Sequence, residues 1–467
     1  MSADPAVRPS VEALTAFLPA QRWFAGKSRQ WEVTGTTTVA ALDERTTLDL
    51  VHVRYADGEA ETYQLPLVRR DAPVEGLAHV LVEEVTGGGG TTWLYDALHD
   101  KEATGLWTGG VASGRREDGV VFHRVDGGAE VDEDATSIVI GAEQSNTSLV
   151  YGGSTIMKVF RKVSFGLNPD IEIHEALVRA GSEHVAEILG WVEGRWTDPA
   201  SGEAGTGSLA MLQCFLTTAT EGWESAKASV RDLYAEGDLH ADEVGGDFAG
   251  EASRLGEATA QVHQALRETL GTGTLDQDAL RALAQGMHER LRRALPEVPG
   301  LEEHADALAA AFDDLAALPG GLPVQRVHGD FHLGQTMRTL KGWKLLDFEG
   351  EPARPLRERQ AMDSPLKDVA GMLRSFDYAA RHLLVDRPEP HLEYRATEWA
   401  ERNRDAFCAG YGEAAGRDPR EDGAVLRAFE VDKAVYEAVY EARNRPGWLR
   451  IPLSAIERLA TQGERRS

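Results

Sequence analysis

The most informative part of the sequence reads VHGDFHLGQ at residues 327–335, followed by WKLLDFE at residues 343–349. Asp330 lies in a turn-forming stretch after an apolar run, whereas Asp347 ends the apolar strand that the second stretch predicts. A Lys-Gly turn separates the two stretches. We therefore expect the two carboxylates to meet at one end of a short hairpin.

The two acids suit the transfer of a phosphoryl group from ATP. Such a reaction needs one carboxylate to orient the attacking hydroxyl and accept its proton, and another to hold magnesium against the phosphate oxygens. We assign the first role to Asp330 and the second to Asp347. Protein kinases place a metal-binding amide five positions after the catalytic Asp, and Gln335 stands at that spacing. A carboxylate and an amide oxygen favour Mg²⁺ over zinc.

Two alternatives stay open for this segment. Glu349 could touch a second magnesium ion, or it could be a carboxylate that faces water. The segment around His328 and Asp330 could also be a plain tight turn, with Asp347 merely ending a strand. In that case three matches at fixed spacing would be accidental.

A lysine in the first half of the chain is a candidate clamp for the donor phosphates. Lys158 lies in the middle of a strand predicted at residues 155–160, where a charge is unusual unless it faces a ligand. We expect a carboxylate of the following helix to hold it, and we favour Glu172 over Glu175. The alternative is an exposed lysine on an edge strand.

Two further segments are weaker candidates for nucleotide contacts. The polar loop with Ser145 and Asn146 lacks a glycine-rich phosphate motif, so it would offer hydroxyl, amide and backbone N–H donors. The apolar strand at residues 209–216 would form a hinge whose backbone, at Gln213 and Phe215, bonds the adenine. A plain core strand explains its apolar residues equally well.

Composition limits the partners of the chain. Its 467 residues carry 49 Lys and Arg against 76 Asp and Glu, and the net charge of -27 repels polyanions. We therefore expect no nucleic-acid surface and no anionic-membrane surface. Membrane spans, a signal peptide and paired cysteines are not apparent, so we expect a cytoplasmic protein with reduced thiols at Cys214 and Cys408.

The pattern of apolar residues changes from strand-like to helical near residue 217. Alternating strand patterns dominate before it, and the glycine run at residues 87–90 is typical of a flexible link between subdomains. The acidic stretch at residues 221–250 indicates a solvated loop or helix face. Helical patterns then occur at residues 250–269, 275–295, 302–318, 394–411 and 420–444. We predict an α+β protein with a mostly β first half and a mainly α second half.

The chain resembles the bacterial maltokinases, which are related to aminoglycoside phosphotransferases. The HGD and DFE elements alone indicate only the wider protein-kinase-like superfamily. The narrower resemblance rests on QRWFAGK at 21–27, DFEGEP at 347–352, DSPLKDVAGM at 363–372, YEAVYEARNRP at 436–446 and IPL at 451–453.

This resemblance implies a bilobal protein-kinase-like fold. Residues 1–90 would form an N-terminal cap subdomain, in which Arg22, Trp23 and Lys27 either fix the cap or line the nucleotide side. Residues 91–216 would form the N-lobe with the hinge at its end. Residues 217–467 would form the α-helical C-lobe with the catalytic and sugar-binding sites.

The resemblance also implies an activity. It is the ATP-dependent phosphorylation of maltose to maltose 1-phosphate, which feeds α-glucan and glycogen synthesis, with ATP and Mg²⁺ as cofactors and trehalose synthase as a candidate partner. One rival is a kinase for another sugar such as glucosamine, whose amine would require an extra carboxylate. Another is a catalytically silent nucleotide-binding scaffold, which predicts the loss of a catalytic residue that is in fact present here.

Sugar contacts are expected from the second half, because a disaccharide needs aromatic platforms and polar groups for its hydroxyls. The helix predicted at residues 420–444 places several suitable side chains roughly on one face. The alternative is a helix that packs through its tyrosines and exposes its charges. The candidate sugar-binding residues are His332, Asp377, Tyr378, Lys433, Tyr436, Glu437 and Asn444. We expect Asp368 to anchor the catalytic loop rather than to bind a ligand.

Overall fold

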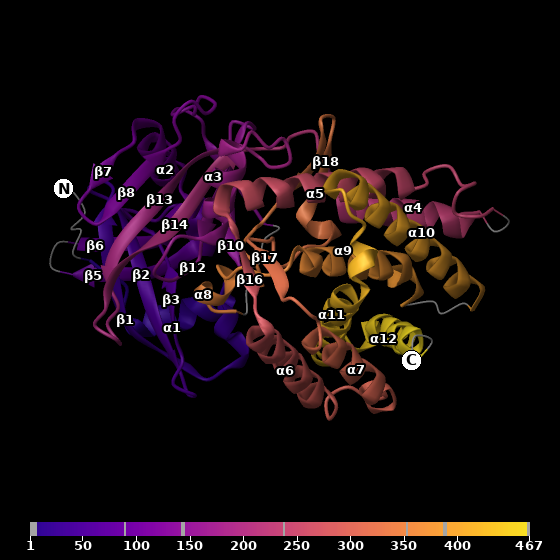
Figure 1. Ribbon diagram of the computed structural model, residues 1–467. Coiled ribbons are helices and arrows are strands. Elements are labelled where there is room, and N and C mark those ends of the chain that lie inside the picture. The colour runs from indigo at the N-terminus through magenta and orange to yellow at the C-terminus, as the bar shows by residue number, and fades with distance from the viewer. Residues whose placement is uncertain are drawn as a thin grey trace. The chain divides into compact units, whose positions relative to one another are not determined.

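The computed structural model describes residues 7–87, 90–141, 145–236, 239–351, 354–385 and 390–464. The chain divides into two compact units. Unit 1 comprises Met1–Glu172 and Ala186–Thr217, and unit 2 comprises Ile173–Val185 and Thr218–Ser467. Figure 1 shows that strands dominate unit 1 and helices dominate unit 2, which confirms the predicted α+β class.

The first sheet of unit 1 has seven strands in the order β12-β3-β2-β4-β6-β5, with β1 paired to β2. The helix α1 (Val11–Phe17) contacts β1 and β5. The strands β2 and β3 pair in antiparallel register on either side of a turn at Gly58. The strands are β1 (Trp31–Ala41), β2 (Thr46–Tyr55), β3 (Ala60–Gln64), β4 (Leu67–Arg70), β5 (Leu81–Gly87), β6 (Gly90–Asp96) and β12 (Lys162–Val163).

The glycine run at residues 87–90, which was expected to link two subdomains, lies between two paired strands of the first sheet. Gly87 ends β5 and Gly90 begins β6, and these two residues face each other in an antiparallel pair. Residues 88 and 89 lie outside the described part of the chain. The first sheet therefore continues past this run to Asp96.

The second sheet of unit 1 also has seven strands, in the order β7-β8-β13-β14-β11-β10-β9. Because β11 lies between β10 and β14, the interpretation of Lys158 as a residue on an edge strand is wrong. The elements are α2 (Lys101–Ser113), β7 (Arg116–Glu117), β8 (Val120–Arg124), β9 (Ser137–Ile140), β10 (Asn146–Tyr151), β11 (Thr155–Phe160), α3 (Pro169–Arg179), β13 (Ile188–Thr197) and β14 (Ala204–Cys214).

A buried arginine joins the two sheets. Arg161 follows β11, and its Nη2 lies 2.5 Å from Asp96 Oδ2 at the end of β6. Its Nε donates to Thr147 Oγ1 at 2.8 Å, and its Nη1 donates to the carbonyl of Gln64 at 3.3 Å. The Trp23 ring lies 4.7 Å from the guanidinium. Trp23 therefore contributes to fixing the first sheet against the second.

We predict that Arg161→Ala destabilises the protein by about 3–5 kcal/mol, because it leaves the carboxylate of Asp96 buried and unpaired. Urea denaturation measures the change. The matched control is Arg54→Ala, whose ion pair with Glu32 is exposed and loose at 3.9 Å, so the midpoint should barely move. Equal losses in the two variants would contradict the role of the buried pair.

Unit 2 is built mainly from long helices. The five predicted helical segments are confirmed, with ends shifted by a few residues, and the structure adds α4, α8, α9 and α12. Part of the acidic stretch predicted as a solvated loop or helix face is the helix α4. The helices are α4 (Gly222–Ala235), α5 (Ala249–Leu270), α6 (Gln277–Ala294), α7 (Ala305–Ala316), α8 (Leu356–Arg359), α9 (Pro365–Arg381), α10 (Pro390–Ala415), α11 (Gly423–Asn444) and α12 (Arg450–Glu464). Short strands complete it: β15 (Thr220–Glu221), β16 (Thr272–Leu275), β17 (Leu322–Gln325), β18 (Thr336–Thr339) and β19 (Gly342–Leu345).

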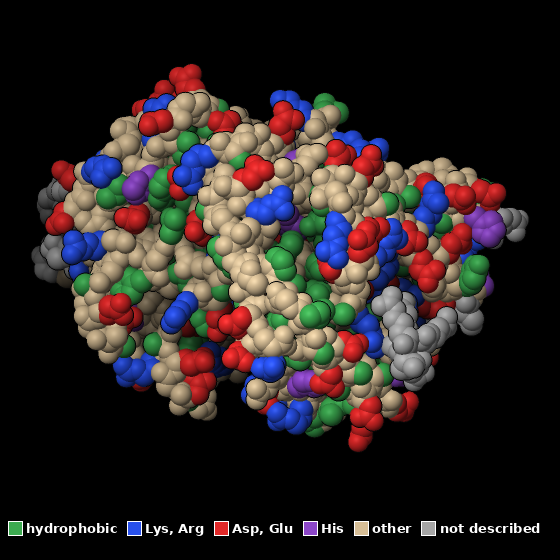
Figure 2. Space-filling view, viewed as in Figure 1, with side chains coloured by type: hydrophobic (Ala, Val, Ile, Leu, Met, Phe, Trp, Pro, Cys, Tyr) green, Lys and Arg blue, Asp and Glu red, His purple; other side chains and the backbone are tan. Residues whose placement is uncertain are grey.

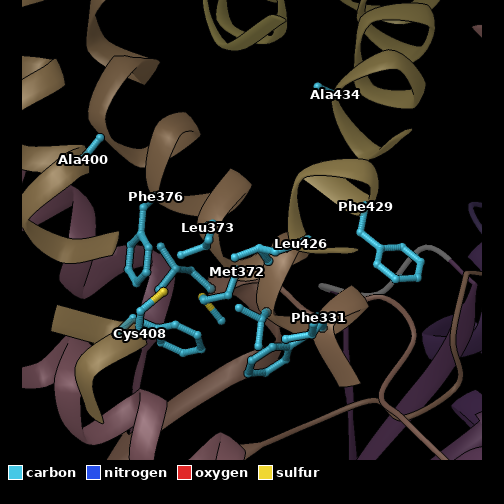
Figure 3. Packing of buried hydrophobic residues seen from close by; sticks show 14 of the residues in the cluster. Phe331, Met372, Leu373, Phe376, Ala400, Cys408, Leu426, Phe429 and Ala434 are labelled. Carbon is cyan, nitrogen blue, oxygen red and sulfur yellow. The ribbon is translucent and has the colours of Figure 1, made fainter. Parts of the chain in front are cut away.

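The core of unit 2 reaches the HGD segment. Phe331 is buried, and Figure 3 shows its ring beside Met372 of α9 and Leu426 of α11. A Cβ atom on Gly371 would lie 2.6 Å from the carbonyl oxygen of Phe331, so only glycine allows α9 to approach the loop this closely. The helix α9 thereby positions the loop that carries Asp330.

The surface carries both signs of charge. Figure 2 shows acidic and basic side chains interspersed on the face in view. Exposed pairs such as Arg281 with Asp278 contribute little to stability. None of the helices among the described residues combines the length and apolar character needed to cross a membrane.

Candidate functional site

The hairpin of β18 and β19 brings two candidate metal ligands together. Thr336 faces Leu345 in the antiparallel register, and the Leu346 N–H donates to the Gln335 carbonyl at 2.9 Å. Gln335 thus lies across from the residue that precedes Asp347. The predicted hairpin is confirmed.

Asp347 has an unusual backbone conformation. Its φ of 55° makes it the one non-glycine residue with positive φ in the described part of the chain. This left-handed region costs energy for residues with a Cβ, although Asp tolerates it better than most. Such strain is concentrated at functional sites, where the surroundings enforce it. Here His328 contributes, because its Nε2 donates to the Leu346 carbonyl at 2.7 Å.

The HGD loop is held by one buried carboxylate. Asp368 in α9 accepts the His328 N–H through Oδ2 and the Gly329 N–H through Oδ1, both at 2.8 Å. Gly329 has φ of 85°, a conformation that favours glycine. Asp368 thus anchors the loop that carries Asp330, as the sequence led us to expect.

Asp330 forms an ion pair that the sequence did not reveal. Its Oδ1 lies 3.0 Å from Lys433 Nζ in α11, and Lys433 also lies 3.9 Å from Glu351. Burial alone would raise the pKa of Asp330, but the Lys433 ammonium, together with the nearby His332 and His328, holds the pKa below its usual range. Asp330 is therefore ionised at neutral pH, as a proton acceptor must be.

We predict that Lys433→Met moves the acid limb of the pH profile of kcat/KM to higher pH. Removal of the ammonium leaves burial to raise the pKa of Asp330, so the base loses its charge at a higher pH than before. The matched control is Lys433→Arg, which keeps the positive charge and should keep the limb in place. Superimposable acid limbs in the two variants would contradict this assignment.

A cavity of about 460 Å³ opens beside this ion pair. Its size is typical of small-molecule sites. Tyr378 and Trp448 both line it and stack with ring centroids 6.4 Å apart, and Tyr436 and Tyr440 of its wall lie one turn apart on α11. Its other side-chain walls are Glu221, Trp223, His332, Ser375, Lys433, Glu437, Glu441 and Arg445. Five of the predicted sugar-binding residues therefore line one cavity: His332, Tyr378, Lys433, Tyr436 and Glu437.

Two predicted sugar-binding residues do not line this cavity. Asn444 donates to the Tyr440 carbonyl at 2.8 Å on an exposed part of α11. Asp377 is buried, and four arginine side chains surround its carboxylate at distances between 2.6 and 3.6 Å: Arg374, Arg381, Arg404 and Arg458. Burial would raise the pKa of Asp377, but these cations lower it strongly. Asp377 is part of a buried ion cluster.

Glu437 connects this ion cluster to the cavity. Arg374 is fully buried and donates to Glu437 Oε2 through Nε at 2.9 Å and through Nη2 at 2.7 Å. The other oxygen, Oε1, makes no hydrogen bond to any described residue. It is therefore available to a hydroxyl or amine in the cavity. Burial raises the pKa of Glu437 against the opposing effect of Arg374.

The candidate phosphate clamp in unit 1 forms an ion pair with Asp170, which the sequence analysis did not name. Lys158 Nζ lies 3.2 Å from Asp170 Oδ2, and both side chains are buried. Asn168 Oδ1 accepts the Asp170 N–H at 2.8 Å, as expected of a helix cap. Glu172, which we favoured as the partner, follows Asp170 in the same first turn of α3.

The other candidate nucleotide contacts are dispersed in unit 1. Ser145 is exposed, and Asn146 is buried in β10 opposite Phe160. Gln213 has a buried amide oxygen without a hydrogen-bond partner among the described residues. The Phe215 N–H already donates to the Ser154 carbonyl at 2.8 Å, so it is not free for an adenine. Gln144 of the same loop lies outside the described residues.

Glu349 has a cationic neighbour. Arg359 Nη1 donates to the Glu349 carbonyl at 3.0 Å and lies 3.8 Å from its Oε2. Its role as a second metal ligand stays a prediction. Asp347 and the Gln335 amide are oxygen donors of the kind that Mg²⁺ accepts beside phosphate oxygens, so the residues present fit this ion.

Sequence reasoning missed several residues of the site. Asp170, Arg374 and Lys433 form ion pairs with partners that the sequence does not place beside them. Lys433 itself was predicted as a sugar contact only. Trp448 and Arg445 lie in or just after the YEAVYEARNRP segment, and that segment was the available signal for them.

Comparison with known proteins identifies two domains. The family described as "Maltokinase N-terminal cap domain" matches residues 17–100. The family described as "Phosphotransferase enzyme family" matches residues 249–421, which include the HGD loop, the hairpin and α9. The first match includes every strand of the first sheet except β12.

Two curated relatives are glucosamine kinases. The protein from Streptacidiphilus jiangxiensis is 32% identical over 253 residues, which span 52% of this chain and 56% of that protein. The protein from Mycolicibacterium smegmatis is 26% identical over 405 residues, or 85% of this chain and 90% of that protein.

Solved structures share the fold. A glucosamine kinase in crystal form B superposes with a TM-score of 0.70 and 24% identity over 97% of this chain and all of that chain. A glucosamine kinase in complex with glucosamine, ADP and inorganic phosphate gives 0.68 and 23%, with 98% of this chain and all of that chain covered.

Proposed function

The chain carries a maltokinase N-terminal cap domain and a phosphotransferase-family domain of the protein-kinase-like superfamily, and on this premise we propose that it is an ATP-dependent sugar kinase acting on maltose. The product would be maltose 1-phosphate, a precursor for α-glucan synthesis. The observation that carries the proposal is the aromatic cavity whose wall includes Lys433, the ion-pair partner of Asp330.

The chemistry follows from the groups around Asp330. The ionised carboxylate of Asp330 accepts the proton of the sugar's anomeric hydroxyl. At the same time the oxygen of that hydroxyl forms a bond to the γ-phosphorus of ATP. The bond from that phosphorus to the bridging oxygen breaks, and ADP leaves. Asp347 and Gln335 would hold Mg²⁺, which neutralises phosphate charge when bound. By resemblance to kinases, Lys158 with Asp170 would hold the donor phosphates.

The cavity suits a disaccharide. Sugar rings present flat apolar faces that stack on aromatic side chains, and their hydroxyls need hydrogen-bond partners. Five aromatic residues line the cavity, namely Trp223, Tyr378, Tyr436, Tyr440 and Trp448, which is enough for more than one sugar ring. For the sugar hydroxyls, Glu437 Oε1 supplies a hydrogen-bond acceptor and the Lys433 ammonium supplies donors.

A second candidate substrate is glucosamine. The curated relatives carry that name, and an amino sugar needs a carboxylate for its ammonium. Glu221 lines the cavity and makes no ion pair with any described residue. Burial raises its pKa, so a cationic ligand would favour its charged form.

We predict that ADP release depends on both Mg²⁺ and maltose, and that maltose gives a higher kcat/KM than glucosamine. A coupled assay of ADP release compares the two sugars, and NMR identifies the phosphorylated position. A preference for glucosamine that Glu221→Gln abolishes would establish the second candidate instead. ADP release without dependence on any sugar would refute both.

We predict that Asp330→Asn lowers kcat by about 10² or more, because the amide cannot accept the proton. Steady-state kinetics at saturating ATP and sugar measure the loss. Asp278→Asn is the matched control, since Asp278 is an exposed acid on α6 and should retain full turnover. Full turnover of Asp330→Asn would remove the base assignment.

A further inference from the structure

A line of buried side chains reaches the HGD loop from the side of α5 and α10. We propose that His263 and Tyr411 are positioning residues for phosphoryl transfer, because they hold the carboxylate of Asp368 in the orientation that receives the loop's N–H groups. This inference rests on the proposed kinase activity for its kinetic test, and it has a structural test of its own.

The line consists of two hydrogen bonds between three side chains. His263 Nε2 lies 3.0 Å from Asp368 Oδ2, and His263 Nδ1 lies 3.0 Å from the Tyr411 hydroxyl. All three residues are buried, with exposed fractions of 5%, 1% and 7% for His263, Asp368 and Tyr411. Bonds between such groups are costly to leave unmade.

For a neutral His263 ring, the donors and acceptors in this line follow from chemistry. An ionised Asp368 can only accept, so Nε2 of His263 carries the proton and donates to it. In the neutral ring Nδ1 is then an acceptor, and the Tyr411 hydroxyl donates to it. Tyr411 thereby selects the tautomer of His263 that presents an N–H to Asp368.

The Asp368 oxygen that contacts His263 also accepts a backbone N–H of the HGD loop. Asp368 Oδ2 receives both the His263 ring N–H and the His328 backbone N–H, whereas Oδ1 receives the Gly329 N–H. A rotation of the carboxylate would disturb all three bonds together. The His263 bond therefore opposes the rotation that would release the backbone next to Asp330.

The two helices that carry the line are locked at close approach. A Cβ atom on Gly256 of α5 would lie 2.1 Å from the Phe407 carbonyl oxygen, and one on Gly410 of α10 would lie 2.0 Å from the Ser253 carbonyl oxygen. Figure 1 shows α5 and α10 in unit 2, and the two helices contact each other along their lengths. This packing fixes the separation of His263 from Tyr411.

A further bond ties His263 to the strand before the loop. Gln325 Nε2 donates to the His263 carbonyl at 2.7 Å, and Gln325 ends β17, three residues before His328. The backbone of His263 and its ring thus both connect α5 to the segment that leads to Asp330. A role in core packing alone would not require these polar bonds.

The kinetic test is Tyr411→Phe, which removes one hydroxyl and leaves a buried acceptor on His263. Small displacements of catalytic groups cost large factors in rate. We expect kcat to fall at least fivefold with whichever sugar the wild-type enzyme phosphorylates, whereas KM for sugar and ATP changes by less than about twofold. His263→Leu should lower kcat at least as much, and His263→Gln, whose amide can donate to Asp368, should recover most of it.

Tyr234→Phe is the matched control for loss of a buried hydroxyl. Tyr234 of α4 donates to the Ala380 carbonyl at 2.5 Å and has no bond to the line, so its removal should leave kcat unchanged. Equal kcat in Tyr411→Phe and Tyr234→Phe would overturn the positioning role. A His263→Gln variant as slow as His263→Leu would do the same.

Amide hydrogen exchange provides the readout that does not depend on activity. The N–H groups of His328 and Gly329 should exchange at least tenfold faster in Tyr411→Phe than in Tyr234→Phe, because their acceptor has lost its support. Unchanged exchange at these two amides would overturn the proposal even if the kinetics agreed. If no sugar is phosphorylated, the proposed function fails, and the exchange result alone decides this inference.

Discussion

The catalytic half of this protein depends on the carboxylate of Asp368 accepting the N–H groups of His328 and Gly329. Those two bonds hold the backbone that leads directly to Asp330. His328 in turn restrains the backbone next to Asp347, because its ring donates to the Leu346 carbonyl. One buried acid thus sets the backbone positions of the proposed base and of a proposed metal ligand. Gly371, on the same helix, allows the loop to approach.

The cavity beside this loop combines aromatic walls with charged side chains that a buried ion cluster holds in place. Glu437 lines the cavity, and its Oε2 accepts hydrogen bonds from Arg374. Arg374 also donates to Asp377. A buried cluster of this kind does little for net stability, because desolvation offsets the attraction between its members. Its effect here is geometric: a carboxylate between Tyr436 and Tyr440 on α11 is kept from turning away from the cavity.

The sequence predicted the parts of this molecule that rest on local pattern. The β18–β19 hairpin, the spacing of Asp330 and Gln335, and the long amphipathic helices all follow from short-range periodicity and turn chemistry. The helix α9 was missed although its apolar residues recur at helical spacing; what local pattern could not show is that Asp368, Arg374, Asp377 and Arg381 are buried in it. Asp377 was misassigned for a related reason, since Arg404 and Arg458 reach it from α10 and α12. Likewise, Asp170 and Glu172 share one turn of α3, and no local pattern indicated that Asp170 reaches Lys158.

The strand β12 completes the first sheet of unit 1 from a part of the chain that lies beyond the N-terminal cap match. Only Arg161 separates β12 from β11, the strand of Lys158, and β12 pairs with β3 as an edge strand of the first sheet. The two sheets of unit 1 are therefore interlaced along the chain, and the first sheet is incomplete without a strand that lies between strands of the second. A truncation that removes residues 7–96 would therefore leave β12, just after the strand of Lys158, without its partner β3, and it would also remove Asp96, the buried partner of Arg161.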